Sequence, residues 1–296
     1  NILPLAIRLI NMRREICTLI KECQIDVVVA HQPPAPWLCS FLPLPVIWNC
    51  AEPIALWKPN RPEYFSLRPS ASNVFLWVLE HIYEWCDRLI VTHGVPYVFV
   101  LSKRLQRQIR SLYGKASEVF YTGVEEDHAS CGDAGWTAQL TKQLHLENAF
   151  VILQVGNFNY EKNHRVTLGM IRRLKDEKAL DDVKLLLVGE GGGLKRAIEE
   201  AIVKDGLGDC VHVLGSVDEA QLHGIYSIAS VLVFPSIMQS WGLVPFEALA
   251  HGVVPVVSTD CGACELIQDQ DIGYVAEPTV EGLYEAVMTM YQHPGE

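Results

Sequence analysis

The chain has 296 residues, of which 49% are hydrophobic and 20% are charged, and its formal net charge is −11. This composition excludes a disordered, collagen-like or disulfide-framed chain, and the length predicts two domains with separate cores. The nine cysteines are expected to be free thiols. All of the excess negative charge lies in residues 148–296, and no Lys or Arg follows Lys204, so we expect no nucleic-acid partner.

The first half alternates between helical and strand patterns. Residues 31–51 carry no charged side chain, but five prolines interrupt them, so we expect a buried loop rather than a membrane span. Ser102 is expected to be the N-cap of a basic helix. The predicted elements are helices over 3–22, 73–85 and 103–113, and strands over 26–30, 46–49, 88–92, 97–101 and 118–122.

The second half is more regular. Its predicted strands cover 150–155, 184–188, 211–214, 231–234, 254–257 and 274–275, and its predicted helices cover 165–175, 194–204, 220–228, 244–250 and 283–291. Strands that are apolar on both faces and alternate with helices predict a parallel sheet covered on both sides. Ligands of such sheets bind at the carboxyl ends of the strands, so functional residues are expected just after each strand.

These patterns predict an α/β fold of two Rossmann-like parallel-sheet domains that face a cleft. We expect an incomplete first domain over residues 1–130, a polar, turn-rich linker over 131–147, and a second domain over 148–296. The chain begins without Met, inside an amphipathic helix, so we expect it to be a piece of a longer protein.

Residues 235–247 follow a predicted buried strand, turn on Gly242 and open a helix with Pro245 in its first turn. The first backbone N–H groups of a helix have no internal partners and can hold an anion such as a phosphate, and Gly242 would let the phosphate approach the backbone. Glu247, about one turn later, would face sugar hydroxyls. An ordinary strand–helix turn with a solvated glutamate is the alternative.

A second loop, residues 156–163, also lies between a predicted strand and a helix. Its Lys162 could neutralise a diphosphate leaving group, although a solvated surface position is the commoner one for a lone lysine. The glycines at 189–193 do not fit a nicotinamide or flavin fingerprint, because Leu194 stands where its last glycine would lie. Asp269 and Asp271 are expected in a surface turn, and no metal site is predicted.

In this order, the loops resemble the retaining nucleotide-sugar-dependent glycosyltransferases of family 4, which have the GT-B fold. The matching motifs are the E-x7-E stretch (Gln239–Glu247), the E-K pair (Glu161 and Lys162), a G-G-x-x-E-like turn (262–265), a G-S-V loop (215–217) and a C-[H/Q]-E-P-like segment (50–53). This resemblance implies a metal-independent hexosyltransferase that acts on a glycan or lipid-linked acceptor.

The resemblance also assigns roles. Glu247 would bind the ribose; Gly156, Asn157, Lys162 and the N–H groups of residues 242–244 would hold the diphosphate; and Ser216 and Val217 would meet the base. Gln239, Glu52 and Ala51 would stand at the reacting sugar.

Three positions depart from the family pattern: Gln239 replaces a glutamate, Asn157 an arginine, and Ala51 a polar residue. Removing a donor that faces developing charge costs on the order of 10²–10³ in rate. A catalytically weak or inactive nucleotide-sugar-binding partner subunit, and a GT-B nucleotide-sugar epimerase, therefore remain alternatives.

Five cations lie on or beside the basic helix: Lys103, Arg104, Arg107, Arg110 and Lys115. They would allow contact with an anionic membrane, although a solvated helix face is the simpler interpretation. We expect a cytoplasmic protein, either free or peripheral at the inner face of the membrane.

Overall fold

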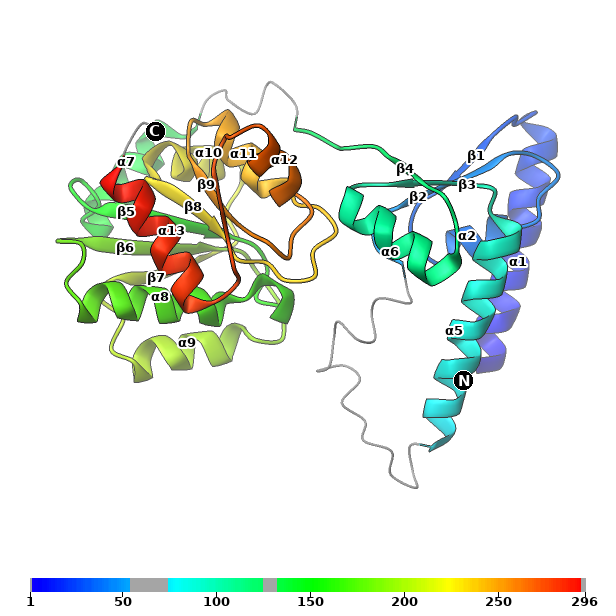
Figure 1. Cartoon of the computed structure of the whole chain (residues 1–296), viewed down its shortest axis with the longest axis horizontal. Helices are drawn as coiled ribbons and strands as arrows, with labels where there is room; N and C mark the ends of the chain where they lie inside the picture. The colour runs from blue at the N-terminus through cyan, green and yellow to red at the C-terminus, as the bar shows by residue number, and fades with distance from the viewer. Residues whose placement is uncertain (1, 54–73, 125–131, 294–296) are drawn as a thin grey trace. The chain divides into compact units, whose positions relative to one another are not determined.

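The computed structural model describes residues 2–53, 74–124 and 132–293. The chain is divided into two compact units, and the boundary lies between Tyr121 and Thr122 (Figure 1). We call them unit 1 (up to Tyr121) and unit 2 (from Thr122). Each unit contains one sheet in which every pair of neighbouring strands is parallel, with helices packed against it. The predicted α/β class is therefore confirmed.

Unit 1 has a four-stranded sheet in the order β1-β2-β3-β4. Its core joins strand residues such as Trp48 and Val98 to Val91 of α5 and to Leu105 and Ile109 of α6. The strands are β1 (Val28–Ala30), β2 (Val46–Cys50), β3 (Tyr97–Val100) and β4 (Glu118–Val119); the helices are α1 (Ile2–Glu22), α2 (Ala35–Cys39), α5 (Val74–Gly94) and α6 (Lys103–Tyr113). The N-cap prediction is confirmed, because the backbone N–H of Leu105 donates to Ser102 Oγ at 3.1 Å.

Unit 2 has a six-stranded sheet in the order β10-β9-β8-β5-β6-β7. Helices α8, α9 and α13 cover one face, and α7, α10, α11 and α12 cover the other. The strands are β5 (Phe150–Val155), β6 (Val183–Val188), β7 (Val211–Gly215), β8 (Val231–Phe234), β9 (Pro255–Ser258) and β10 (Tyr274–Ala276). The helices are α7 (Ala134–Leu144), α8 (His164–Asp176), α9 (Lys195–Lys204), α10 (Glu219–Ile228), α11 (Val244–Ala250), α12 (Cys264–Asp269) and α13 (Val280–Gln292).

Three local predictions are wrong. Residues 88–92 are not a strand but the last part of α5, because no turn residue separates them from the preceding helical pattern. The predicted loop over 31–51 contains the short helix α2, which tolerates its prolines because the N–H groups of a first helical turn need no partner.

The third concerns the linker over 131–147. It contains α7, which begins at the Asp133 cap and packs on α10 of unit 2. Residues 125–131, where the expected linker begins, lie outside the described residues.

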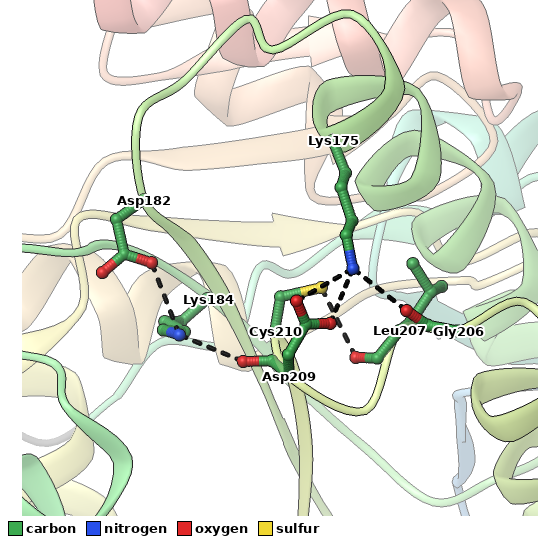
Figure 2. Close-up of polar contacts among 7 residues, drawn as sticks. All are labelled: Lys175, Asp182, Lys184, Gly206, Leu207, Asp209 and Cys210. Atoms are coloured by element: carbon green, nitrogen blue, oxygen red, sulfur yellow. Dashed lines mark hydrogen bonds and ion pairs between the residues drawn. The ribbon is translucent and has the colours of Figure 1, made fainter.

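A network of polar contacts braces unit 2 at the amino ends of β6 and β7 (Figure 2). The Lys175 ammonium donates to both carboxylate oxygens of Asp209, at 2.7 and 2.9 Å, and Lys184 Nζ donates to the Asp209 carbonyl at 3.0 Å. This network lies at the opposite edge of the sheet from the carboxyl ends, where a ligand of a doubly wound sheet is expected. We therefore regard it as structural.

Candidate functional site

The sheet order reverses between β5 and β8 of unit 2. The chain proceeds outward from β5 through β6 to β7, then returns to β8 on the other side of β5 and continues to β9 and β10. At such a reversal the two loops that leave the neighbouring strands diverge, and the crevice between them is the usual ligand site of this architecture. The two loops predicted to hold a diphosphate are those that leave β5 and β8.

The structure brings Lys162, Gln239 and Gly156 together at this point. Lys162 ends a short 3-10 turn (Tyr160–Lys162) after β5, and its Nζ donates to Gln239 Oε1 at 2.9 Å. The same ammonium lies 5.1 Å from the centre of the Phe234 ring. Gly156 has φ of +152°, and a Cβ at this position would come within 3.1 Å of the Lys162 side chain, so the glycine makes room for the lysine.

Backbone contacts fix the loop after β8. The N–H of Ile237 donates to the Glu161 carbonyl at 2.8 Å, which ties this loop to the one after β5. On its other side, the N–H of Met238 donates to Asp260 Oδ2 at 2.7 Å, and the N–H of Gly262 donates to the Gln239 carbonyl at 2.9 Å. The loop that carries Gln239 is therefore held from two sides.

Gly242 has a packing reason of its own. A Cβ there would lie 2.8 Å from Cε1 of Phe234, the last residue of β8, and 3.5 Å from Cys261 Sγ. Close approach to an aromatic ring requires a glycine here whether or not a ligand binds. The presence of a glycine at position 242 therefore does not by itself indicate a phosphate-binding site.

The backbone donors at this turn do fit the prediction. Within the described residues, the N–H groups of Gly242, Leu243 and Val244 make no hydrogen bond, whereas those of Phe246 and Glu247 donate to the Leu243 carbonyl at 2.8 and 3.0 Å. Pro245, which has no N–H, occupies the first turn of α11. Three donors are consequently available on the loop that also carries Gln239, the hydrogen-bond partner of Lys162.

Glu247 is half-buried in α11, and a buried tyrosine holds it. The hydroxyl of Tyr226, from α10, donates to Glu247 Oε2 at 2.9 Å. Burial, followed by the negative charge of Glu247, raises the pKa of Tyr226, so the hydroxyl keeps its proton. His251 stacks on the Tyr226 ring with centroids 4.9 Å apart, and its Nδ1 lies 2.8 Å from the Glu247 carbonyl oxygen.

Sequence reasoning missed Tyr226 and His251. Tyr226 lies on the apolar face of α10 and is 1% exposed, so its pattern is that of an ordinary core residue. Only the hydroxyl distinguishes it, since a buried tyrosine needs a partner for its O–H.

His164 is a third missed residue. It begins α8, is 3% exposed and stacks on Phe158 with centroids 4.7 Å apart. Burial, followed by the charge of Lys162, lowers the pKa of His164 to about 4, so the ring is neutral near pH 7. It supports the loop that carries Lys162.

Other predicted site residues are not joined to this group. Asn157 is exposed after β5, and Ser216 and Val217 follow β7, three strands from β8 in the sheet order. The glycine-rich loop before α9 packs on the β5 loop instead of forming a cofactor fingerprint. A Cβ at Gly192 would come within 2.3 Å of the Phe158 carbonyl oxygen.

Ala51 and Glu52 belong to unit 1, just after β2. Both are half-buried, and Ala51 brings only a methyl group to this edge of its sheet. Elsewhere in unit 1, burial raises the pKa of Asp87, although hydrogen bonds from Tyr113 Oη at 2.7 Å and Trp37 Nε1 at 2.6 Å oppose this shift. Asp87 is therefore a structural carboxyl in the core of unit 1.

The described residues lack two kinds of feature. They contain no group of three or more His, Cys, Asp or Glu side chains that could hold a metal ion. None of their helices has the length and apolar character needed to cross a bilayer.

Comparison with solved structures identifies the fold. Over 97% of its length, the chain matches 69% of the sucrose-phosphate synthase of Thermosynechococcus elongatus, with a TM-score of 0.77 and 19% identity. Over 95% of its length, it matches 72% of Anabaena Alr3699/HepE in complex with UDP, with a TM-score of 0.74 and 17% identity. The two-domain Rossmann-like fold is that of the GT-B glycosyltransferases.

Sequence comparison identifies the family. An uncharacterized glycosyltransferase of Methanocaldococcus jannaschii is 26% identical over 63% of this chain and 48% of its own length. A D-inositol 3-phosphate glycosyltransferase of Geodermatophilus obscurus is 32% identical over 58% of this chain and 40% of its own length. The chain thus spans about half or less of these relatives. The model of the family Glycosyl transferases group 1 matches residues 137–296, more than half of the chain, and the chain therefore belongs to that family.

Proposed function

We propose that the whole protein is a retaining, family 4 glycosyltransferase that moves a hexose from a nucleotide-diphosphate sugar to a glycan or lipid-linked acceptor. The observation that carries this proposal is the contact between Lys162 and Gln239 at the β5–β8 reversal, beside the unpartnered N–H groups of residues 242–244. A cation and convergent backbone donors are the groups that a diphosphate requires. UDP in the complex of Alr3699/HepE makes a uridine nucleotide the first ligand to test.

In this proposal, Glu247 accepts hydrogen bonds from the ribose hydroxyls. Tyr226 occupies Oε2, so Oε1 is the oxygen that can turn to the ligand. The carboxylate is half-buried, which strengthens a hydrogen bond relative to one in bulk water.

The reaction requires charge stabilisation more than a strong base. The acceptor hydroxyl attacks the anomeric carbon on the face from which the diphosphate leaves, and a departing phosphate oxygen takes the hydroxyl proton. The glycosidic bond to the acceptor forms while the bond to the phosphate breaks. Lys162 and the three backbone donors would stabilise the negative charge that develops on the leaving diphosphate, and no metal is needed for this role.

The glutamine at position 239 has a physical consequence. Because Gln239 is neutral, its contact with Lys162 is a hydrogen bond and not an ion pair, which a glutamate at this position would form. With Oε1 occupied, the two amide N–H donors of Gln239 are the groups that can reach a sugar hydroxyl. We infer that Lys162 serves the diphosphate and Gln239 the sugar.

A thermal-shift panel of UDP-, GDP- and ADP-glucose on the whole protein tests the proposal. We expect one of the three sugar nucleotides to raise the melting temperature of the protein more than the other two. Glu247→Ala should weaken binding of that ligand about tenfold, from the loss of ~1–3 kcal/mol in a charged hydrogen bond. The matched control is Glu199→Ala, which removes the same charge from exposed α9. No stabilisation by any of the three ligands would overturn the proposal.

A partner subunit that binds the nucleotide sugar without turnover is the second candidate, and the methyl side chain of Ala51 favours it. The triple change Ala51→His, Asn157→Arg and Gln239→Glu separates the two. A large gain in transfer would identify a decayed site, and a loss would identify residues adapted to the present reaction. For a GT-B epimerase, incubation of the donor without an acceptor would yield an altered sugar.

A further inference from the structure

Unit 1 contains a pocket that the proposed reaction does not use. It has a volume of about 450 Å³ and lies between one face of α6 and residues 114–117, which follow that helix. Gly114 adopts a left-handed conformation, with φ of +64°, at the end of α6. Gln106 Nε2 of α6 then donates to the Ser117 carbonyl at 2.5 Å, which holds the segment beside the helix.

Positive charge dominates the pocket wall. Arg107, Arg110 and Lys115 line it, and no carboxylate does. Among the described residues, neither arginine forms an ion pair or a side-chain hydrogen bond, although the two are neighbours at i,i+3 spacing and repel each other. The Lys115 ammonium donates to the Thr92 carbonyl at 2.9 Å, and partial burial lowers its pKa. An anion in the pocket would reduce the repulsion between the two arginines and would stabilise the charged form of Lys115.

Neutral donors complete the site. Ser117 lines the pocket and is only 8% exposed, and its buried hydroxyl has no hydrogen-bond partner within the described part of the chain. The backbone N–H groups of Ala116 and Ser117 likewise donate to no described group. A buried hydroxyl without a partner is unfavourable, so this arrangement fits a ligand that accepts hydrogen bonds.

A structural explanation accounts for only part of these features. Cations in the last turn of a helix are favourable because they complement the helix dipole, and this explains Arg110. It does not explain why Arg107, one turn earlier, and the unpartnered Ser117 face the same pocket. Three cations together with hydroxyl and N–H donors suit the tetrahedral oxygens of a phosphate.

We propose that this pocket binds the phosphate group of a phosphate ester. The pocket is larger than a phosphate ion, so the group would arrive on a larger molecule, either a soluble phosphate ester or a lipid headgroup. This site is independent of the diphosphate site proposed in unit 2, and its residues belong to a different unit.

The test uses the whole protein and two probes. Inorganic phosphate, titrated at constant ionic strength, is followed by the amide NMR signals of Ala116 and Ser117. Vesicles containing phosphatidylcholine and phosphatidylglycerol in equal amounts are followed by co-sedimentation. The variants are the pair Arg107→Gln with Arg110→Gln, and Ser117→Ala. The control pair, Arg14→Gln with Lys21→Gln, removes the same charge from exposed positions of α1 in the same unit.

We expect saturable binding of phosphate that the arginine pair weakens about tenfold and Ser117→Ala several-fold, while the control pair leaves it unchanged. Ser117→Ala is informative because it preserves net charge and removes a hydroxyl with no partner. If vesicles bind and phosphate does not, with the same pattern among variants, the ligand is a lipid headgroup. Equal losses in the arginine pair and the control pair, or no binding of either probe, would overturn the proposal.

Discussion

Replacing Tyr226 with Phe tests how Glu247 is held. The substitution keeps the ring that stacks on His251 and removes only the hydroxyl that donates to Glu247 Oε2 at 2.9 Å. A hydrogen bond to a charged group contributes ~1.5–3 kcal/mol, and Tyr226 is 1% exposed, so water cannot replace the lost donor. We expect the free energy of unfolding to fall by about 2 kcal/mol.

The same change should affect ligand binding. If Glu247 binds the ribose while Tyr226 fixes its position, loss of the tether should weaken UDP binding by up to about tenfold, which corresponds to ~1.4 kcal/mol. Isothermal titration calorimetry with UDP and urea unfolding measure the two effects. A double-mutant cycle with Glu247→Gln should give a coupling of about 1 kcal/mol or more in UDP binding.

The control for this cycle is Tyr284→Phe, which removes a hydroxyl that donates to Glu177 Oε2 at 2.6 Å on the exposed surface of unit 2. It should leave UDP affinity unchanged. Additive effects of Tyr226→Phe and Glu247→Gln on UDP binding would refute the positioning role, even if both variants were less stable.

Three further predictions concern charge. Lys162→Ala should weaken UDP binding far more than uridine binding, with exposed Lys204→Ala as the control; equal losses would exclude a phosphate role. The folded-state pKa of His164 is about 4, below its ordinary value of 6.5, so its contribution to stability is present above pH 6.5 and is lost as the pH falls towards 4. The loss should reach ~3 kcal/mol and be absent in His164→Gln, as measured by urea unfolding across that range. For Asp87 the pH dependence of stability has the opposite sign. Because the folded-state pKa of Asp87 is raised, wild-type stability relative to Asp87→Asn should decrease as the pH rises above the ordinary Asp pKa.

Much of the fold followed from periodicity in the sequence. Buried parallel strands are apolar on both faces, so each strand of unit 2 was located to within one or two residues, and the order of loops followed from that. The failures occurred where periodicity is ambiguous. The run at 88–92 is apolar and short, and only its continuity with the preceding residues identifies it as part of α5.

The candidate site was predictable in part. The loops that carry Lys162 and Gln239 were located because they follow strands, but their direct contact depends on the pairing of β5 with β8, which no local pattern encodes. Tyr226 and His251 were missed because the hydrogen bond of Tyr226 to Glu247 and the stacking of His251 on the Tyr226 ring both join α10 to α11. For Gly242, packing against Phe234 accounts for the glycine without a ligand, which sequence spacing alone does not distinguish.

The contact between Lys162 and Gln239 joins residues 77 positions apart in the chain. No fragment that lacks the returning half of the sheet can assemble it, so the site forms only after the slow, long-range steps of folding. A ligand that binds there would bind the folded domain and not its partly folded states. It would therefore slow unfolding of the entire domain. The amount of ligand bound at saturation would measure the fraction of protein in a preparation that is folded.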